Sequence, residues 1–435
     1  MVSPKSHVVS MSKKIIKPSS PTPSSLRRHN LSFLDQLASP AHNPLAFFYP
    51  KLEKSWYDLN HISTILENSL ANVLTSYYPF AGTVKENMFV DCNDVGAEFF
   101  NVRVDFPMSE ILNHPYNDAT NFVYPQGCPW NTSYEGTLVV TQLTHFDCGG
   151  IAVGVCISHK VADAYSVIKF ITDWASLTRD SGLAKPSTLF DGTSFFPPTN
   201  DLSILPNFEP EKDENCVTRL YHFSSSGLDR LKIIAAAESG VENPTRVEVA
   251  TALVHKHAMA ASAKTNNSGS FKPSLLCHIM GLRPPLPLSN IGNACSFFLS
   301  MTSKDDEMKF PNLVAELRKA KHQLRDKLKN VPQNEVFFQV LEIIKGGAEL
   351  LEQVSKSDVY KCSSLCHFGL YNTDFGWEKP TRVTSASPGV KNQMFFMDSP
   401  SGNGLDVVVT LEEKDMEIFQ SDKGLLEFAS PIVKM

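Results

Sequence analysis

A long segment without regular periodicity divides this sequence into two halves of similar length. Residues 183–216 are rich in Pro, Ser, Asp and Asn and follow neither a helical nor a strand period. At more than thirty residues, the segment is longer than the loops found inside compact domains. The 435 residues also exceed what one ordinary hydrophobic core accommodates. We therefore expect two domains, residues 1–190 and 217–435, joined by a linker at 191–216.

The clearest local pattern lies shortly before that linker. Residues 138–143 and 151–157 are rich in β-branched residues, and the turn 146–150 (Phe-Asp-Cys-Gly-Gly) between them is typical of a hairpin. Beyond residue 157 the period becomes helical, with Val167, Phe170, Ile171 and Trp174 on one face. His159 therefore lies at a strand-to-helix junction, a position where rigid elements present functional side chains.

Other segments predict further regular elements. Apolar residues at helical spacing favour helices at 59–77, 225–237, 246–261 and 312–328. The first should end before Pro79, because the residue preceding a proline avoids helical backbone angles. Strands are expected at 217–223, 393–397 and 405–411.

The composition excludes several kinds of partner. Hydrophobic residues make up 42% and charged residues 20% of the chain, which is ordinary for a globular protein. A formal net charge of -6 argues against nucleic acid or an anionic membrane as the main partner, since both attract basic surfaces. No run of about 18 apolar residues predicts a membrane span, and the N-terminus lacks the apolar core of a secretory signal. We expect a cytosolic protein with no membrane partner.

The nine cysteines have no paired C-x-x-C spacing. Cys362 and Cys366 are the closest pair, and no second pair with metal-ligand spacing accompanies them. This pattern indicates reduced thiols in a reducing compartment and no bound metal.

The sequence from His159 to Asp163 has the pattern H-x-x-x-D, which is weak when taken alone. His114 to Asp118 fits it too, but in a polar segment with proline directly after the histidine, which indicates an exposed loop. At the strand-to-helix junction, a neutral imidazole could accept a hydroxyl proton during attack on a thioester carbonyl. From position alone, a structural histidine and a general base both remain open.

A second motif, Asp374-Phe375-Gly376-Trp377, lies near the C-terminal end. Its simplest interpretation is an aromatic turn that closes a hydrophobic cluster. Gly376 between two large aromatic residues suggests a constrained backbone.

Taken together, the two motifs resemble those of the plant BAHD acyltransferase family, in order and in separation. Four further blocks resemble the family, so the likeness extends over essentially the whole chain. They are Leu31 to Leu37, Tyr77 to Gly82, Pro244 to Val249, and Leu282 to Pro287 followed by Gly292-Asn293.

The resemblance implies an α/β fold of two similar-sized domains, each a mixed β-sheet flanked by helices as in chloramphenicol acetyltransferase. A long crossover joins the domains, a segment near 370–395 returns to the first, and the active-site channel runs between them. His159 would be the general base, and Asp374 is often grouped with it as catalytic. Asp163 would pair with Arg283 and, with Gly376 and Trp377, support the site structurally. We expect Asp374 to hold the architecture and the coenzyme region rather than to transfer a proton.

The implied reaction is direct acyl transfer from acyl-CoA to a hydroxyl group within a ternary complex, with no metal and no permanently bound cofactor. The residues that contact CoA and the oxyanion donors are not identified by the sequence. The chain departs from the family pattern at Ala164 and Glu378, where Gly is usual, and at residues 363–368, which lack the usual Trp and Arg. At these positions, and at Asn293-Ala294-Cys295, the chain resembles the vinorine synthase-like branch of the family, whose members acetylate alkaloids. A carboxylate at Glu378 would repel CoA phosphates.

We therefore predict a monomeric acetyl-CoA-dependent transferase for a hydroxylated, monoterpenoid indole-type alkaloid. A different donor (malonyl or benzoyl) or an amine acceptor is the first alternative. A non-catalytic protein that binds CoA or a metabolite on the same fold is the second. A hydrolase is a third, although the sequence contains no G-x-S-x-G motif to support it.

Overall fold

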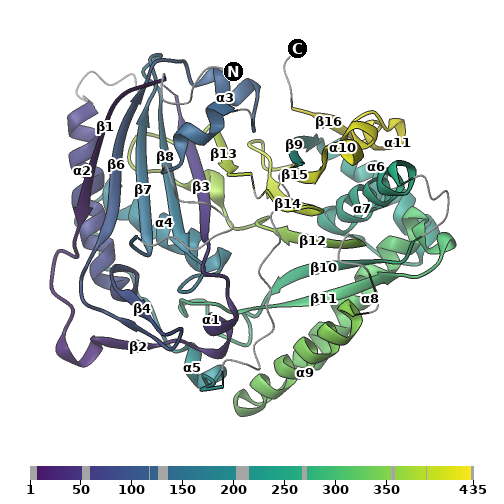
Figure 1. Cartoon of the computed structure of the whole chain (residues 1–435), viewed down its shortest axis with the longest axis horizontal. Helices are drawn as coiled ribbons and strands as arrows, with labels where there is room; N and C mark the ends of the chain where they lie inside the picture. The colour runs from purple at the N-terminus through teal and green to yellow at the C-terminus, as the bar shows by residue number, and fades with distance from the viewer. Residues whose placement is uncertain are drawn as a thin grey trace.

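Two large β-sheets, one in each half of the molecule, lie side by side in the computed structural model (Figure 1). The structure describes residues 7–50, 59–116, 118–125, 136–201, 215–266, 272–352, 354, 358–387 and 389–432. Helices pack on each sheet (Figure 1). The fold is a two-domain α/β fold with mixed sheets, as the resemblance implies.

The first sheet has six strands, and apolar side chains cover both of its faces. On β3, Leu45, Phe47 and Tyr49 face one hydrophobic cluster, whereas Ala46 and Phe48 face another, because successive strand residues point to opposite faces. Helices α2 (Leu59–Ser76) and α4 (Ala164–Arg179) contribute to the first cluster. Helix α3 (Ser109–Asn113) and η4 (Asp118–Val123) contribute to the second. The strand order is β1 (Val8–Ile16), β6 (Ala97–Val104), β7 (Val139–His145), β8 (Ile151–Ser158), β3 (His42–Tyr49) and β13 (Arg382–Ser385), with β6 and β7 parallel.

The second sheet has seven strands and one large hydrophobic core against its helices. That core includes side chains of α6 (Ser225–Ser239), α7 (Arg246–Thr265), α8 (Phe310–Leu328) and α10 (Glu413–Phe419). Helices α9 (Gln333–Leu351) and α11 (Lys423–Leu426) complete this half. The strand order is β11 (Cys295–Thr302), β10 (Ser274–Gly281), β12 (Val359–Ser364), β14 (Gln393–Asp398), β15 (Leu405–Glu412), β9 (Cys216–Phe223) and β16 (Ala429–Pro431).

Several short segments cross between the two halves. Strand β13, from the C-terminal part of the chain, pairs with β3 of the first sheet. In the opposite direction, α1 (Phe33–Leu37) and α5 (Gly192–Phe195) contribute Phe33 and Phe195 to the core of the second half. Because of these exchanges, the domain limits at 190 and 217 stay predictions. A small sheet of β2 (Arg28–Asn30), β5 (Phe89–Asp91) and β4 (Thr83–Lys85) lies in the first half. Short 3₁₀ helices are η2 (Ser24–Leu26), η3 (Tyr78–Ala81), η6 (Asp305–Met308) and η8 (Leu370–Asn372).

The elements expected from periodicity are confirmed. The hairpin and the helix that follow it are β7, β8 and α4, and the helix expected at 59–77 is α2. The apolar stripe of α8 is buried as expected, at Leu313, Leu317, Ala320, Leu324 and Leu328. Helix α8 begins at Phe310, two residues before the expected start. Pro311 fits within the first helical turn, because a backbone N–H at that position would have no partner within the helix.

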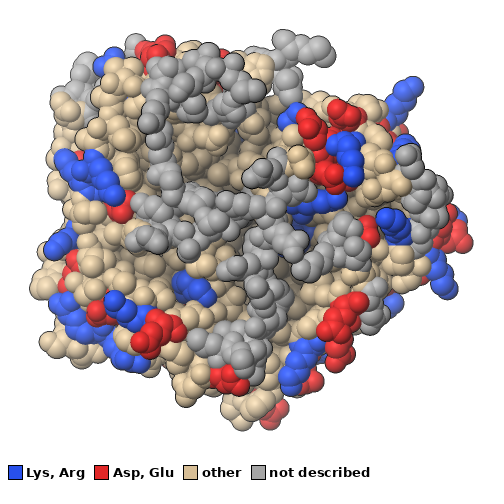
Figure 2. All heavy atoms as spheres, in the orientation of Figure 1, with Lys and Arg blue, Asp and Glu red and all other residues tan. Residues whose placement is uncertain are grey.

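Charged side chains of both signs are interspersed on the face of the molecule that Figure 2 shows. Among the described residues, no helix is both long and apolar enough to cross a bilayer.

Candidate active site

His159 lies in the loop between β8 and α4, as its place in the sequence predicts. Its backbone N–H donates to the carbonyl of Ala41, 2.8 Å away, so the loop is fixed to the segment before β3. Four residues later, Asp163 is the N-cap of α4, and its Oδ1 accepts the N–H of Ser166 at 2.9 Å. The strand therefore carries the chain to His159, and the capped helix begins directly beyond it.

A cavity of about 340 Å³ opens next to His159, between the two halves. Its wall from the second half follows the alternation of strand residues, because Lys361 and Ser363 of β12 face the cavity while Tyr360 and Cys362 lie in the core. Its wall from the first half includes His159, Asp163, Ala164 and Tyr165. The remaining lining from the second half includes Ile279, Gly281, Cys295 and Phe395.

Among the described residues, Asn293 is the hydrogen-bond partner of the His159 imidazole, and its chemistry defines the tautomer. Nδ1 lies 2.9 Å from Oδ1 of Asn293. The Nδ2 group of Asn293 donates to the carbonyl of His159 (2.7 Å) and to Oδ1 of Asp35 (2.8 Å). Because both of these are acceptors, the amide nitrogen must face them and the amide oxygen must face Nδ1. Nδ1 therefore carries the hydrogen, and the lone pair of Nε2 is available to a ligand in the cavity.

Asp163 and Arg283 form a buried ion pair at the edge of the cavity. Nη1 of Arg283 lies 2.6 Å from Oδ2 of Asp163, and the two side chains are 4% and 7% exposed. Oδ2 also accepts the N–H of Ala294 at 3.0 Å, so the carboxylate is fully engaged. The guanidinium of Arg283 stacks over the ring of Tyr165, at 4.6 Å from its centroid. Asp163 thus fastens α4 to the segment that carries Asn293.

Asp374 lies outside the cavity lining and organises its own loop. Its Oδ1 accepts the N–H groups of Gly376 (2.7 Å) and Glu378 (3.1 Å), and Arg179 of α4 lies 3.8 Å from Oδ2. Gly376 has φ +107°, which a residue with a Cβ rarely adopts. Burial, with the nearby charge of Asp374, raises the pKa of Tyr49 well above its usual value, so its hydroxyl stays a donor, here to the carbonyl of Thr373 at 3.0 Å.

The aromatic residues of this motif fasten the loop to the first half. Phe375 and Trp377 stack with centroids 5.6 Å apart and planes at 15°. The ring of Tyr49 meets both of them edge-on, and Trp174 of α4 meets Phe375 at 5.1 Å. The structure therefore brings together His159, Asp163 and Arg283, while Asp374, Gly376 and Trp377 form a separate cluster that contacts Trp174 and Arg179 in the C-terminal half of α4.

The second H-x-x-x-D pattern is not near this site. His114 is the C-cap of α3 and is not in the cavity lining, and the side chain of Asp118 lies outside the described residues. His114 is partly buried rather than in the exposed loop that the sequence indicates, because it closes the end of a short helix. The pattern alone therefore does not distinguish the two histidines.

Two residues that contact this site had no role assigned from the sequence. Asn293 and Asp35 both lie in family-like blocks, but nothing local indicates that they meet, since they are 258 positions apart. In the sequence, the one local signal of a constrained turn is the pair Gly292-Asn293, in which a polar residue follows a glycine. In the structure, Gly292 has φ +133°.

Cys295 carries the thiol in the described cavity lining. Burial, together with the nearby carboxylates of Asp163 and Asp35, raises its pKa to about 12. The thiol is therefore neutral at physiological pH and a weak nucleophile. Among the described residues, no group of three or more His, Cys, Asp or Glu side chains could hold a metal ion.

The fold and the histidine site define a class of acyl-transferring enzyme, and comparison with known proteins gives the same result. A model described as the Transferase family matches residues 6–426. The chain is 51% identical over 429 residues to acylsugar acyltransferase 3 of Solanum lycopersicum, covering 98% of each. It is 43% identical over 431 residues to akuammiline synthase 1 of Alstonia scholaris, covering 97% of each.

Among solved structures, that of vinorine synthase superposes with a TM-score of 0.84 at 28% identity, over 98% of this chain and 100% of that one. The chain belongs to the Transferase family, that of the plant BAHD acyltransferases, and is an acyltransferase.

Proposed function

We propose that the protein transfers an acyl group from acyl-CoA to a hydroxyl group of a plant specialised metabolite, with His159 as the general base. The observation that carries this proposal is the hydrogen bond between Nδ1 of His159 and Asn293, which leaves Nε2 as the basic atom at the cavity. Nε2 removes the acceptor proton while the oxygen attacks the thioester carbonyl. The tetrahedral intermediate then breaks its carbon–sulfur bond, and the CoA thiolate takes the proton from the imidazolium.

The transfer is direct, without an acyl-enzyme. An acyl-enzyme needs an activated nucleophile next to a base. Cys295 is neutral because of its raised pKa, and the charged groups that act on its thiol are Asp163, Arg283 and Asp35. The acceptor and acyl-CoA must therefore occupy the site together, as a ternary complex.

Asp163 and Asp374 have structural roles in this proposal. The carboxylate of Asp163 is taken up by Arg283 and by two backbone N–H groups, so no oxygen remains for a substrate proton. Asp374 is bound by two N–H groups of its own loop and does not line the cavity. Both aspartates act by holding α4 and the loops beside it.

For the donor and acceptor we propose acetyl-CoA and a hydroxylated alkaloid, on the resemblance to the vinorine synthase-like branch. A second acceptor class, a partly acylated sugar, is favoured by the charge of the cavity. In the described lining, Asp163 is the one acidic residue, and it is paired with Arg283. A protonated amine finds no counter-ion there, whereas sugar hydroxyls and acyl chains suit the serine and apolar walls. The 51% identity to acylsugar acyltransferase 3 points the same way.

The test is a matrix of donors (acetyl-, malonyl- and benzoyl-CoA) against acceptors (a hydroxylated indole alkaloid, a partly acylated sucrose and a primary amine). Free thiol release and product mass are measured together. We expect thiol release with acetyl-CoA and an ester product, which H159A abolishes while acyl-CoA binding persists. Turnover that survives H159A would refute the base assignment. Ester formation on the sucrose alone would select the sugar, and on the alkaloid alone would select the alkaloid.

The monomeric state and the cytosolic location are proposals too. Light scattering of the purified chain tests the first, and fractionation of the tissue that expresses it tests the second.

A further inference from the structure

The cavity histidine is connected to a buried carboxylate that lies on a different element and that the reaction does not otherwise use. Asp35, on α1, is 3% exposed. Its Oδ1 accepts two hydrogen bonds from Asn293, one from the backbone N–H (2.8 Å) and one from Nδ2 (2.8 Å). Its Oδ2 accepts two from Ser32, one from the N–H (2.9 Å) and one from Oγ (2.6 Å).

The two oxygens of Asp35 thus accept hydrogen bonds from different segments of the chain. Oδ2 completes the capping box of α1 with Ser32, which is an ordinary structural role. Oδ1 reaches the residue that accepts the hydrogen of His159. A capping carboxylate needs one oxygen for its helix, so the bonds to Asn293 are an addition that the helix does not require.

The charge on Asp35 determines which way the Asn293 amide faces. A carboxylate only accepts hydrogen bonds, so it holds Nδ2 toward itself and leaves Oδ1 facing His159. If the amide turned over, its NH₂ group would face Nδ1, and the imidazole hydrogen would move to Nε2. An imidazole that is protonated at the atom facing the substrate cannot accept the substrate's proton.

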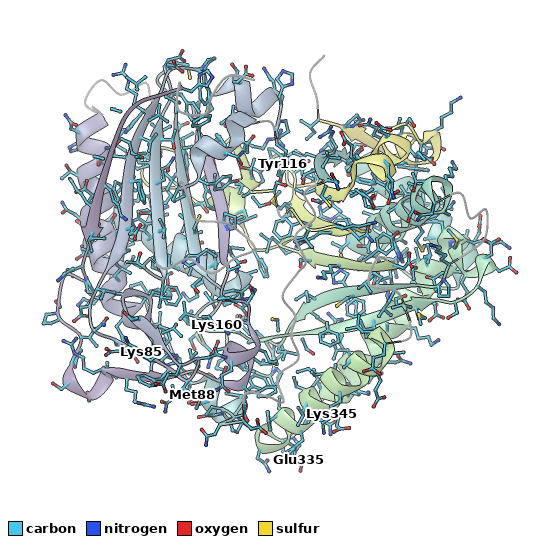
Figure 3. All side chains as sticks on the ribbon, viewed as in Figure 1. Lys85, Met88, Tyr116, Lys160, Glu335 and Lys345 are labelled. Atoms are coloured by element: carbon cyan, nitrogen blue, oxygen red, sulfur yellow. The ribbon has the colours of Figure 1, made fainter. Side chains whose placement is uncertain are left out.

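The surroundings hold α1 in place for this purpose. Phe33 packs edge-on against Phe337 of α9, with centroids 5.2 Å apart, so α1 is anchored in the second half. Lys160, the neighbour of His159, lies beside α1 (Figure 3), and its Nζ donates to the carbonyl of Gln36 at 2.9 Å. A Cβ on Gly292 would lie 3.5 Å from Oδ1 of Asp35, so the loop approaches the carboxylate closely.

We infer that Asp35 is a positioning residue for the general base: through Asn293 it holds His159 in the tautomer that has a free Nε2. Its negative charge also stabilises the imidazolium that forms during transfer. Because α1 is anchored in the second half and His159 belongs to the first, the competence of the base depends on how the two halves are docked. This inference rests on the proposed function of His159.

The first experiment compares D35N with S32A, which removes a bond to the other oxygen of the same carboxylate. We expect D35N to lower kcat ten- to a hundredfold with little change in either KM, and to move the acidic limb of the pH–kcat profile to lower pH. S32A should leave kcat within twofold, although both variants weaken the cap of α1. If D35N and the wild type have equal kcat values, or if D35N and S32A lose kcat to the same extent, Asp35 acts only as a helix cap.

The second experiment tests whether Asp35 acts through Asn293. In a double-mutant cycle, D35N should cost little further kcat in an N293A background, whereas independent roles would give multiplicative losses. Full multiplicativity would overturn the inference.

The third readout does not need turnover, so it separates this inference from the proposed function. The ¹⁵N shifts of the labelled imidazole report which nitrogen carries hydrogen, with H159Q identifying the signals of His159. The wild type should be the Nδ1–H tautomer, and D35N should show a substantial Nε2–H population. An unchanged tautomer in D35N would overturn the inference even if the enzyme transfers acyl groups as proposed. A changed tautomer without any acyl transfer would retain the link between Asp35 and His159 and refute the function.

Discussion

At the scale of single residues, this site depends on a few backbone positions that only certain side chains tolerate. Gly292 and Gly376 both have positive φ angles, and each precedes a residue that the site or its supporting loop needs. Glu378 has φ +89° without being glycine. A side chain in that region costs about 1 to 3 kcal/mol unless its contacts compensate. The side chain of Glu378 is exposed, and the hydrogen bond from its backbone N–H to Oδ1 of Asp374 offsets only part of that cost.

We predict that E378G raises the free energy of unfolding by about 0.5 to 1 kcal/mol, because glycine relieves the backbone strain. E378Q is the matched control, since it removes the charge and retains the Cβ. If the carboxylate repels CoA phosphates, both variants should lower the KM for acyl-CoA, while E378G alone gains stability. Urea unfolding and steady-state kinetics measure the two effects. Equal stability of E378G and the wild type would show that this backbone carries no strain.

At the scale of elements, the site is built where strand and helix meet, and the sequence predicts this junction well. The change of period near residue 158 is local, so β8, His159 and α4 follow from neighbouring residues alone. Local periodicity gives little signal for strand β1, because its sequence VVSMSKKII alternates poorly and its side chains are mostly exposed. Helix α9 was not predicted, although Val336, Val340 and Ile344 are spaced as one buried face.

A capping box that is shared between two helices provides a test at this scale. Glu248 closes the N-terminus of α7 with Thr245 and also receives Arg318 (2.6 Å) and Lys321 (3.2 Å) from α8. Burial alone would raise the pKa of Glu248, but these donors outweigh it and lower the pKa to about 2. The carboxylate therefore joins two helices and not only one helix end.

We predict that E248Q lowers the free energy of unfolding by about 1 to 2 kcal/mol at pH 7, because glutamine keeps the cap and loses the charge. The folded pKa lies below the unfolded one, so the carboxylate stabilises the fold above about pH 4.5, and that stability is lost as the pH falls toward 2. The difference in free energy of unfolding between E248Q and the wild type, measured by urea titration, should narrow as the pH falls from about 4.5 toward 2. A difference that does not depend on pH would mean that shape, rather than charge, matters here.

At the scale of the whole molecule, the arrangement of the two halves was predictable only through resemblance. No periodicity places β13 beside β3 or Asp35 beside Asn293, because these contacts join residues hundreds of positions apart and local patterns contain no such information. The same limit applies to the site. The sequence could indicate His159 from its junction, but Asn293, which defines its tautomer, required the folded chain. Asp374 illustrates the reverse, since a prominent motif lies outside the cavity lining.

The stability of the whole chain should also depend on pH through two buried histidines, one in each half. His145, at the end of β7, has no hydrogen-bond partner on either ring nitrogen within the part of the chain that the structure describes, and burial, helped by the charge of Arg103, lowers its pKa to about 4. His255, in α7, is 1% exposed, and burial lowers its pKa to about 3. Both rings are therefore neutral in the folded state at pH 5, where most unfolded chains would have protonated them.

Because the unfolded state binds more protons, the free energy of unfolding must rise with pH in this range. We predict that His145 and His255 together make it fall by about 2 to 3 kcal/mol per pH unit as the pH drops from 6 to 4, which corresponds to one proton taken up by each on unfolding. His278, whose pKa burial lowers to about 4, adds to the fall in the same direction. H145F should remove the contribution of one proton, about 1.4 kcal/mol per pH unit, from that slope. At pH 5, its free energy of unfolding should therefore rise by about 2 kcal/mol relative to the wild type, compared with the difference between the two proteins at pH 7.5. The comparison at pH 7.5 isolates the change in packing, because the imidazole is neutral there in both states. Urea midpoints at both pH values measure the effect, and parallel curves for H145F and the wild type would show that His145 does not couple folding to protonation.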